Sequence, residues 1–385
     1  MKNRPAYFDY AATTPLDPRV LAVMQRHLTL DACFGNPASL HAYGREAMQA
    51  VDHARLQVAT SIGALPSEII FTSGATESNN LAIKGAMALY QRKGRHLITF
   101  KTEHKAVLDP AQQLEKEGCL VTYLNPLPDG SLDFDALQKA ITPETVLVSL
   151  MHINNETGVV NDIARAGELT RRLGVLLHVD AAQSIGKCVL NVNEVQADLI
   201  SLSAHKAYGP KGVGALYLRK KPRVRVHPFI QGGGQEQGMR SGTLATHQIA
   251  GMGEAFALAV AERETECARI QVFNDHLMAV VNGNPRLHLN AASALRVPHI
   301  LNIQFESQLA DAILENWPDI AASTAAACQG KSIEGSHVLR AMGLTAEQVK
   351  SSIRFSMGRF TTEIEVNKLK QALMLAVSWH RTMPT

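Results

Sequence analysis

The segment Val146 to Asp180 reads VLVSLMHINNETGVVNDIARAGELTRRLGVLLHVD and contains two apolar runs separated by a helix-like stretch. The first run is Val146 to Met151 and the second is Leu176 to Asp180. Nearly continuous apolar runs of this length are typical of strands that are buried on both faces of a sheet. A strand, a helix and a second strand in this order form the repeating unit of a parallel sheet covered by helices. The segment therefore predicts an α/β fold.

The same alternation extends on both sides of this segment. From about residue 60 to 260, short β-rich runs alternate with helical stretches. The seven runs that we expect to be strands are Ile69 to Thr72, His96 to Phe100, Val121 to Leu124, Val146 to Met151, Leu176 to Asp180, Leu199 to Leu202 and Gly214 to Leu218. Together they predict a mostly parallel, seven-stranded sheet flanked by helices.

The pattern changes after about residue 250. A long helix over residues 250–273 is followed by a Pro- and Asn-rich patch, a short strand over residues 300–305 and a final helix. Thr362 and Glu365 have the spacing of a capping box at the start of that last helix. We expect a large domain of residues 15–260 and a smaller α+β domain made of residues 1–14 and 261–385.

The composition excludes several classes of protein. Of 385 residues, 46% are hydrophobic and 19% charged, and 38 Lys and Arg against 35 Asp and Glu give a net charge of +3. Such a balance argues against a dedicated nucleic-acid binder. No run approaches the roughly 18 apolar residues of a membrane span, and the start MKNRPAYFDYAATT lacks the apolar core of a signal peptide. We expect a soluble, cytoplasmic protein that binds neither membranes nor nucleic acid directly.

The five cysteines are scattered along the chain, at Cys33, Cys119, Cys188, Cys267 and Cys328. Their number is odd and no C-x-x-C pair occurs, so the sequence indicates neither a disulfide framework nor a zinc site. We expect no resident metal. Any functional cysteine would act alone, as a thiolate.

Polar clusters directly follow five of the expected strands. These clusters are Ser73 to Thr76, Thr102 to His104, His152 to Glu156, Asp180 to Gln183 and Ser203 to Lys206. Ligands of parallel α/β sheets bind at the carboxyl ends of the strands. The clusters therefore predict one crevice that receives polar groups from five strand ends.

The first cluster has the features of a phosphate site. Ser73-Gly74-Ala75-Thr76-Glu77-Ser78-Asn79-Asn80 lies between an expected strand and an expected helix. Small residues there expose backbone N–H groups, which with the helix dipole favour an anion, and the Thr76 hydroxyl is a further donor. A simple helix cap is the alternative interpretation of this segment alone.

Asp180 and Lys206 add two charged groups to the crevice. A carboxylate at the end of a buried strand is costly unless it is paired, so we expect a cationic partner for Asp180. Lys206 could bind a phosphate, pair with Asp180 or form a Schiff base. A phosphate turn, a buried Asp and a strand-end Lys together match one cofactor, pyridoxal phosphate (PLP).

Nine segments share their order and spacing with one enzyme family. They are Phe8 to Pro15, Gly35 to Ser39, Ser73 to Asn80, Thr102 to Val107, Asn154 to Gly158, Asp180 to Gln183, Ser203 to Gly212, Gly232 to Thr243 and Arg354 to Ser356. Over nearly its whole length the chain resembles the cysteine desulfurases of the NifS/IscS type, in the class-V branch of the PLP-dependent transferases of fold type I. The resemblance implies that fold and PLP as cofactor.

The resemblance also implies roles for the residues around the ring. Lys206 would bind the PLP aldehyde as a Schiff base and later move a proton between the substrate Cα and the cofactor. His104 would stack on the ring and act as acid and base. Asp180 would keep the pyridine nitrogen protonated, and Gln183 would hydrogen-bond the ring oxygen.

Further residues would bind the phosphate and the substrate. The phosphate ligands that the resemblance implies are Gly74, Ala75, Thr76, Ser203 and His205, and Thr243 from a neighbouring subunit, so it also implies a homodimer. Arg354 and Asn155 would bind the substrate carboxylate, and Asn155 would also contact the cofactor.

Cys328 lies in Ser323-Thr324-Ala325-Ala326-Ala327-Cys328-Gln329-Gly330, a run of small residues that predicts an exposed loop. In the resembling family, the thiolate at this point attacks Sγ of the PLP-bound cysteine, forms a persulfide and releases alanine. A transient role as an iron–sulfur ligand is also possible for this thiol. The family pattern Ser-Gly-Ser-Ala-Cys is Thr-Ala-Ala-Ala-Cys here, which should stiffen the loop.

The resemblance predicts a cysteine desulfurase that converts L-cysteine to L-alanine and passes sulfur to acceptor proteins. The sulfur would serve iron–sulfur cluster assembly or the thiolation of tRNA or DNA. The alternatives are a selenocysteine lyase, another class-V aminotransferase or a non-catalytic scaffold. A scaffold would predict the loss of Lys206, His104 or Cys328, and all three are present.

Overall fold

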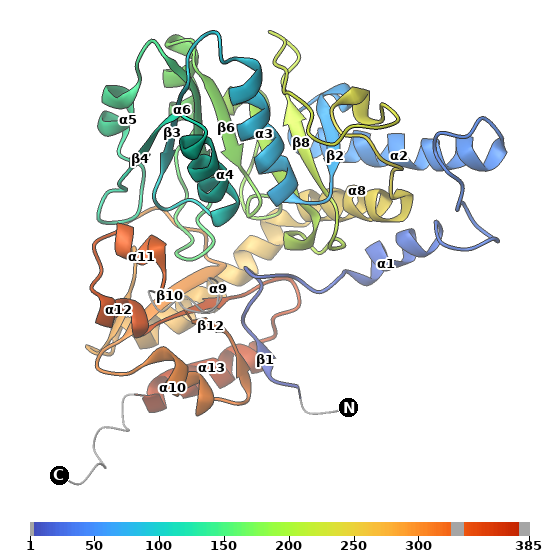
Figure 1. Cartoon of the computed structure of the whole chain (residues 1–385). Helices are drawn as coiled ribbons and strands as arrows, with labels where there is room; N and C mark the ends of the chain where they lie inside the picture. Colours follow the sequence, from blue (N-terminus) through green and yellow to red (C-terminus); the bar gives the residue numbers. More distant parts are fainter. Residues whose placement is uncertain (1–3, 325–334, 377–385) are drawn as a thin grey trace.

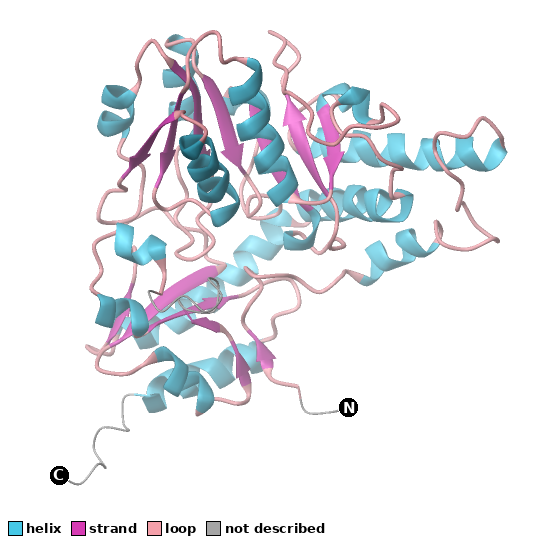
Figure 2. Ribbon diagram, viewed as in Figure 1, coloured by secondary structure: helices cyan, strands magenta, loops and turns pink. Residues whose placement is uncertain are grey.

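The computed structural model describes residues 4–324 and 335–376 (Figure 1). A large lobe holds a sheet between layers of helices, and a smaller lobe lies against the same end of that sheet at which its parallel strands finish (Figure 2). Within these residues, no helix is both long enough and apolar enough to cross a bilayer.

The large lobe contains the seven strands that the sequence predicts. They are β2 (Ile69–Thr72), β3 (His96–Phe100), β4 (Leu120–Leu124), β5 (Thr145–Met151), β6 (Leu176–Asp180), β7 (Leu199–Ser203) and β8 (Gly214–Leu218). Their order in the sheet is β2-β8-β7-β6-β5-β3-β4. Only β8 runs antiparallel to its neighbours. The predicted mostly parallel α/β sheet is confirmed.

Helices cover both faces of this sheet (Figure 1). They are α1 (Pro18–Gln25), α2 (Ala42–Ser61), α3 (Ala75–Leu89), α4 (Lys105–Lys116), α5 (Phe134–Ala140), α6 (Ile163–Arg172), α7 (Val192–Val195) and α8 (Thr246–Ala261). Successive residues of one strand reach different cores: Leu147 packs with α3 and α4, whereas Val148 packs with α2, α6 and α8. Because side chains alternate along a strand, burial on both faces requires the continuous apolar runs seen in the sequence.

The smaller lobe is built on a four-stranded antiparallel sheet with the order β12-β13-β10-β9. Its elements are α9 (Arg263–Asn282), β9 (Leu287–Leu289), β10 (Ile300–Phe305), α10 (Ala310–Glu315), β11 (Ile320–Ala321), β12 (Ser323–Thr324), α11 (His337–Ala341), α12 (Ala346–Lys350), β13 (Ser352–Ser356) and α13 (Glu363–Ala376). The predicted capping box of α13 is present, since Thr362 and Glu365 exchange hydrogen bonds. The N-terminal strand β1 (Ala6–Tyr7) pairs with β11 of this lobe.

The prediction of one long helix over residues 250–273 is wrong. Two helices, α8 and α9, meet at Glu262. Its carboxylate binds Arg19 at 2.5 Å and Arg359 at 3.4 Å. The chain changes direction here because α8 packs against α1 and α2 in the large lobe, whereas α9 packs against α13 in the smaller one.

The glycine-rich segment 232–238 is anchored to the large lobe by Glu236. The two carboxylate oxygens accept hydrogen bonds from Arg55 at 2.6 and 2.8 Å, and Oε2 also accepts from the Phe71 N–H at 2.7 Å. Glu236 is buried, so its charge is balanced inside the protein by this guanidinium.

We expect Glu236→Ala to destabilise the protein by about 2 kcal/mol, because it leaves the half-buried Arg55 charge unpaired and the buried Phe71 N–H without its acceptor. Chemical unfolding measures the change. Glu117→Ala is the control, since this carboxylate receives an exposed hydrogen bond from Gln113. Equal stability of the two variants would contradict the prediction.

Candidate active site

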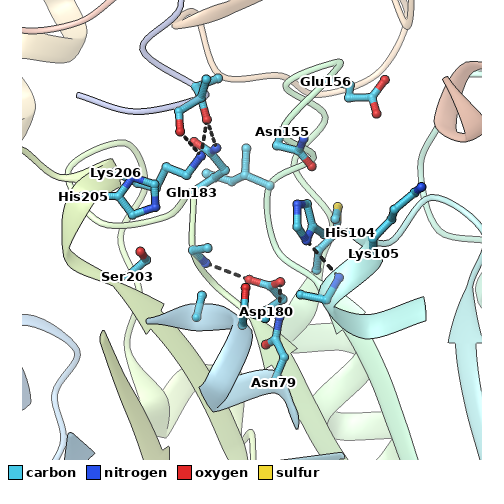
Figure 3. A pocket seen from close by; sticks show the side chains of 18 of the residues that line it. Asn79, His104, Lys105, Asn155, Glu156, Asp180, Gln183, Ser203, His205 and Lys206 are labelled. Carbon is cyan, nitrogen blue, oxygen red and sulfur yellow. Dashed lines mark hydrogen bonds between the residues drawn. The ribbon is translucent and has the colours of Figure 1, made fainter. Parts of the chain in front are cut away.

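A pocket of about 320 Å³ lies where the parallel strands end, between the two lobes. It receives side chains from the helix or loop that follows β2, β3, β5, β6 and β7 (Figure 3). Nine sequence-predicted residues that line it are Ala75, Thr76, His104, Asn155, Asp180, Gln183, Ser203, His205 and Lys206. A tenth, Arg354, reaches it from the smaller lobe.

One wall of the pocket is the start of α3. Gly74 is the N-cap residue, has φ 151°, and makes no side-chain capping bond. The first N–H groups of a helix have no acceptor inside the helix, so Ala75 and Thr76 offer donors to a ligand at the positive end of the helix dipole. Ser203 and His205 line the same pocket. These groups fit a phosphate.

Asp180 lies at the end of the central strand β6 and is buried. Its Oδ2 accepts from Asn79 Nδ2 at 2.7 Å and its Oδ1 from the Ala182 N–H at 3.0 Å (Figure 3). The expected cationic partner is therefore replaced by two neutral donors, which fix the carboxylate facing the pocket. Its charge fits a protonated ring nitrogen placed there, because such a group would supply the missing positive charge.

His104 is the N-cap of α4, and its Nδ1 accepts from the Ala106 N–H at 3.0 Å. A backbone N–H can only donate, so Nδ1 carries no proton and Nε2 is the N–H group of the neutral ring. Burial lowers the pKa of His104, an effect that the charge of Asp180 opposes. The ring is therefore a neutral donor beside the pocket.

Lys206 ends the short 3₁₀ turn Ala204–Lys206 that follows β7. Its Nζ donates to the carbonyl oxygens of Ala11 and Ala12, at 2.5 and 2.6 Å. Gln183 Nε2 donates to the same Ala11 oxygen at 2.8 Å. The N-terminal segment thus holds two side chains at the pocket entrance (Figure 3).

Arg354 on β13 is buried, and it is held by three oxygen atoms. Its two terminal nitrogens donate to the Asn155 carbonyl at 2.9 Å, to Asp9 Oδ1 at 2.7 Å and to Ser323 Oγ at 3.1 Å. The Nε–H group is buried, and among the residues that the structure describes it has no partner. A planar cation that lines the pocket and has a buried, unpaired Nε–H suits a carboxylate ligand.

Two predicted residues lie elsewhere. Thr243 is exposed and does not line the pocket of its own chain. Cys328 falls outside the described residues. In the described part of the chain, no group of three or more His, Cys, Asp or Glu is placed to hold a metal ion.

The sequence did not identify the residues that hydrogen-bond to the predicted site residues and keep them in position. Asn79, which binds Asp180, lies one helical turn after Ala75, and this spacing places both on one face of α3. Asp9, which binds Arg354, lies in the matched N-terminal segment. Only the spacing of Asn79 was a usable signal, because the partner of Asp9 is 345 residues away.

Glu103 is a second buried carboxyl beside the pocket. Its Oε1 accepts from the Met151 N–H at 2.8 Å, while Oε2 is without a partner among the described residues. Burial, with a contribution from the charge of Asp180, raises the pKa of Glu103 well above its usual value of 4.5. We infer that this carboxyl is protonated in the folded protein.

Glu103→Gln tests this inference through the pH dependence of stability. Above pH 4.5 the unfolded chain releases the Glu103 proton but the folded one keeps it, so the parent should lose stability relative to the variant by about 1.4 kcal/mol per pH unit. The difference in stability between the parent and Glu103→Gln stops growing once the pH exceeds the pKa of Glu103 in the folded protein. Urea unfolding across pH measures it, with exposed Glu117→Gln as control. Parallel curves for the parent and Glu103→Gln would refute the inference.

Comparisons with a family model and with curated proteins point to the same group of enzymes. Residues 6–369 match the model of the aminotransferase class-V family. The chain is 53% identical to the cysteine desulfurase IscS of Vibrio atlanticus over 98% of this chain and 94% of that protein. It is 54% identical to the protein of the same name from Pseudomonas entomophila, over 97% of this chain and 93% of the relative.

Solved structures agree. A NifS-like protein superposes with a TM-score of 0.90 at 34% identity, over 97% of this chain and all of the other. The structure of SspA in complex with cysteine gives a TM-score of 0.82 at 36% identity, over 93% of this chain and 100% of the other. DndA from Streptomyces lividans superposes with a TM-score of 0.78 at 40% identity, over 90% of this chain and 98% of the other.

Proposed function

Because the chain belongs to the aminotransferase class-V family, we propose that it is a PLP-dependent cysteine desulfurase, which converts L-cysteine to L-alanine and passes the sulfur on. The observation that carries this function is the pocket itself. One cavity brings together the start of α3, the buried carboxylate of Asp180, the strand-end Lys206 and the buried guanidinium of Arg354. A PLP enzyme acting on an amino acid needs these four parts.

Each part of the cofactor has residues suited to hold it. Ala75, Thr76, Ser203 and His205 would bind the phosphate, with Gly74 shaping the turn before α3. Asp180, held by Asn79, would face the ring nitrogen, and Gln183 the ring oxygen. When bound, PLP supplies an aldehyde for an amine and a ring that withdraws electrons from the substrate Cα.

The protein's own groups position the substrate and move its protons. Arg354 Nε and the Asn155 side chain would bind the carboxylate, while Asp9 and Ser323 keep the guanidinium in place. Lys206 Nζ would remove and return the proton at Cα. His104, neutral and with its proton on Nε2, would donate a proton on the pocket side.

Cys328 would accept the sulfur. Its thiolate attacks Sγ of the substrate, the Cβ–S bond breaks, and the carbon keeps the electron pair and takes a proton to become the methyl group of alanine. The enzyme thiol gains one sulfur atom as a persulfide. The relatives called cysteine desulfurase support this sulfur transfer. The next carrier would be an acceptor protein of iron–sulfur cluster assembly or of tRNA or DNA thiolation, in the cytoplasm.

We also propose a homodimer. The loop between α1 and α2 and the start of α2 extend away from the lobes (Figure 1) and expose large apolar side chains. These are Leu28, Leu30, Phe34, Leu40 and Tyr43, exposed by 54, 75, 47, 91 and 48%. Apolar groups gathered in this way are typical of a surface that a second subunit covers. Thr243, exposed on its own chain, would then reach the partner's phosphate.

Alanine release from L-cysteine by the PLP-loaded protein, with a reductant present, tests the activity. Cys328→Ala should stay yellow, because Cys328 does not hold the cofactor, and should lose at least about 100-fold in rate, because the sulfur acceptor is gone. Cys267→Ala, which removes a cysteine that does not line the pocket, is the control and should retain activity.

Two outcomes would overturn the proposal. Full activity of Cys328→Ala would favour a selenocysteine lyase or an aminotransferase, neither of which needs this thiol. A parent protein that takes up no PLP would exclude every reaction of this class.

Complementation between two inactive variants tests the shared site. Each pocket would use Lys206 of its own subunit and Thr243 of the other subunit. A mixed dimer of one Lys206→Ala chain and one Thr243→Ala chain therefore contains one pocket in which both residues are intact. Random exchange should therefore restore about one quarter of the parental activity. Alanine release after mixing and subunit exchange measures it, and each variant mixed with itself is the control. No recovery from a demonstrated mixed dimer would exclude Thr243 from the partner's site.

A further inference from the structure

A second lysine, Lys187, lies beside the pocket and has no part in the chemistry described above. It follows Gln183 by one turn of the segment after β6. Its Nζ donates to two oxygens of that one residue, the backbone O at 3.1 Å and Oε1 at 3.2 Å. Lys187 and Lys206 also line the same small cavity, opposite the main pocket.

The contacts of Lys187 decide which way the Gln183 amide points. An ammonium group only donates, so it must face the amide oxygen. A carbonyl oxygen only accepts, so Ala11 must face the amide nitrogen, which it does at 2.8 Å. Gln183 is buried, with 4% of its surface exposed, so these two protein contacts are the main constraints on its amide. The two neighbours select one orientation, with Nε2 on the side of Ala11 and Lys206.

Lys187 is not part of an ion pair in the described residues. No carboxylate oxygen there lies within 4.0 Å of its Nζ, and the nearby Glu266 is already bound to Tyr208 and Arg359. Other titratable or charged groups around it are Cys188, Cys267 and His299, together with Tyr10, Lys206, Tyr208 and Arg359, which line the same small cavity. Burial lowers the pKa of Lys187 to about 8. A desolvated ammonium held mainly by one glutamine is costly for the fold, which indicates a role in the site.

We propose that Lys187 is a positioning residue of this enzyme: by holding Gln183 Oε1, it presents Gln183 Nε2 as the hydrogen-bond donor to the ring oxygen of the cofactor. The proposal rests on the function proposed above and adds a residue to its machinery. Lys187 touches neither the cofactor nor the substrate and acts only through Gln183.

The direction of its effect follows from the charge on the ring oxygen. A hydrogen bond to an anionic oxygen stabilises the anion and lowers its affinity for a proton. Loss of Lys187 leaves the Ala11 carbonyl as the one remaining described contact that orients the Gln183 amide, which loosens the amide and weakens that bond. The proton held between the ring oxygen and Lys206 should then be released at a higher pH.

Lys187→Met tests the proposal in the PLP-loaded protein. Methionine has a similar length and carries no charge, so the variant should fold, which thermal unfolding checks. We expect the pH midpoint of the visible absorption change to rise by about one unit, a tenfold gain in proton affinity. Lys187→Arg keeps a donor and should stay close to the parent. An equal rise in both variants, or none in Lys187→Met, would overturn the proposal.

Two further comparisons separate positioning from general damage. Lys93→Met removes a lysine that also donates to a backbone carbonyl, at 2.5 Å from Gly174, but does not line the pocket, and it should leave the midpoint unchanged. Gln183→Leu should raise the midpoint by itself, and adding Lys187→Met should then raise it no further. Additive shifts would mean that Lys187 acts independently of Gln183, and would overturn the proposal.

Failure of the proposed function is distinguishable from failure of this inference. A parent protein without PLP absorption would overturn both. Normal absorption and alanine release in the parent, with an unchanged midpoint in Lys187→Met, would overturn only the role of Lys187.

Discussion

The carboxylate of Asp180, buried at the end of the central strand β6, is the constraint on which the arrangement of the site depends. A charge in this position is stable only with good partners, and Asn79 and the Ala182 N–H supply two. The first ties Asp180 to α3, whose start is the wall proposed to bind the phosphate. The hydrogen bond thereby fixes the position of this wall relative to the carboxylate.

The N-terminal segment forms hydrogen bonds with pocket residues of both lobes. The Ala11 carbonyl receives Lys206 and Gln183 from the large lobe, and Asp9 receives Arg354 from the smaller lobe. The segment passes between the lobes and bonds to both. The end of the pocket with Lys206 and Gln183 and the end with Arg354 are therefore placed relative to each other by a short stretch of chain with little regular structure.

The sequence predicted those features of the protein that are encoded within a short stretch of neighbouring residues. The strands of the large lobe are buried on both faces and appear as apolar runs, and the polar clusters after them mark the pocket. The break between α8 and α9 was missed, because it depends on α8 packing against α1 and α2 while α9 packs against the distant α13. The roles of Asn79 and Asp9 were missed because their partners, Asp180 and Arg354, lie 101 and 345 residues away. Lys187 was missed although Gln183 is only four residues before it, because the sequence does not show that the two side chains meet. Cys328 was identified by family resemblance, and its loop lies outside the described residues.

The pairing of the N-terminal strand β1 with β11 also affects how the protein is made. Residues 6–7 bind residues 320–321, and Asp9 binds Arg354, so this segment has partners that are synthesised more than 300 residues later. Domains generally fold as units during synthesis, and contacts between distant parts of a chain form slowly. The strands of the large lobe are complete by residue 218, long before β11 exists. The lobe that carries Lys206 is therefore synthesised before the strands that complete the pocket, and Arg354 can join the pocket only once β13 has been made.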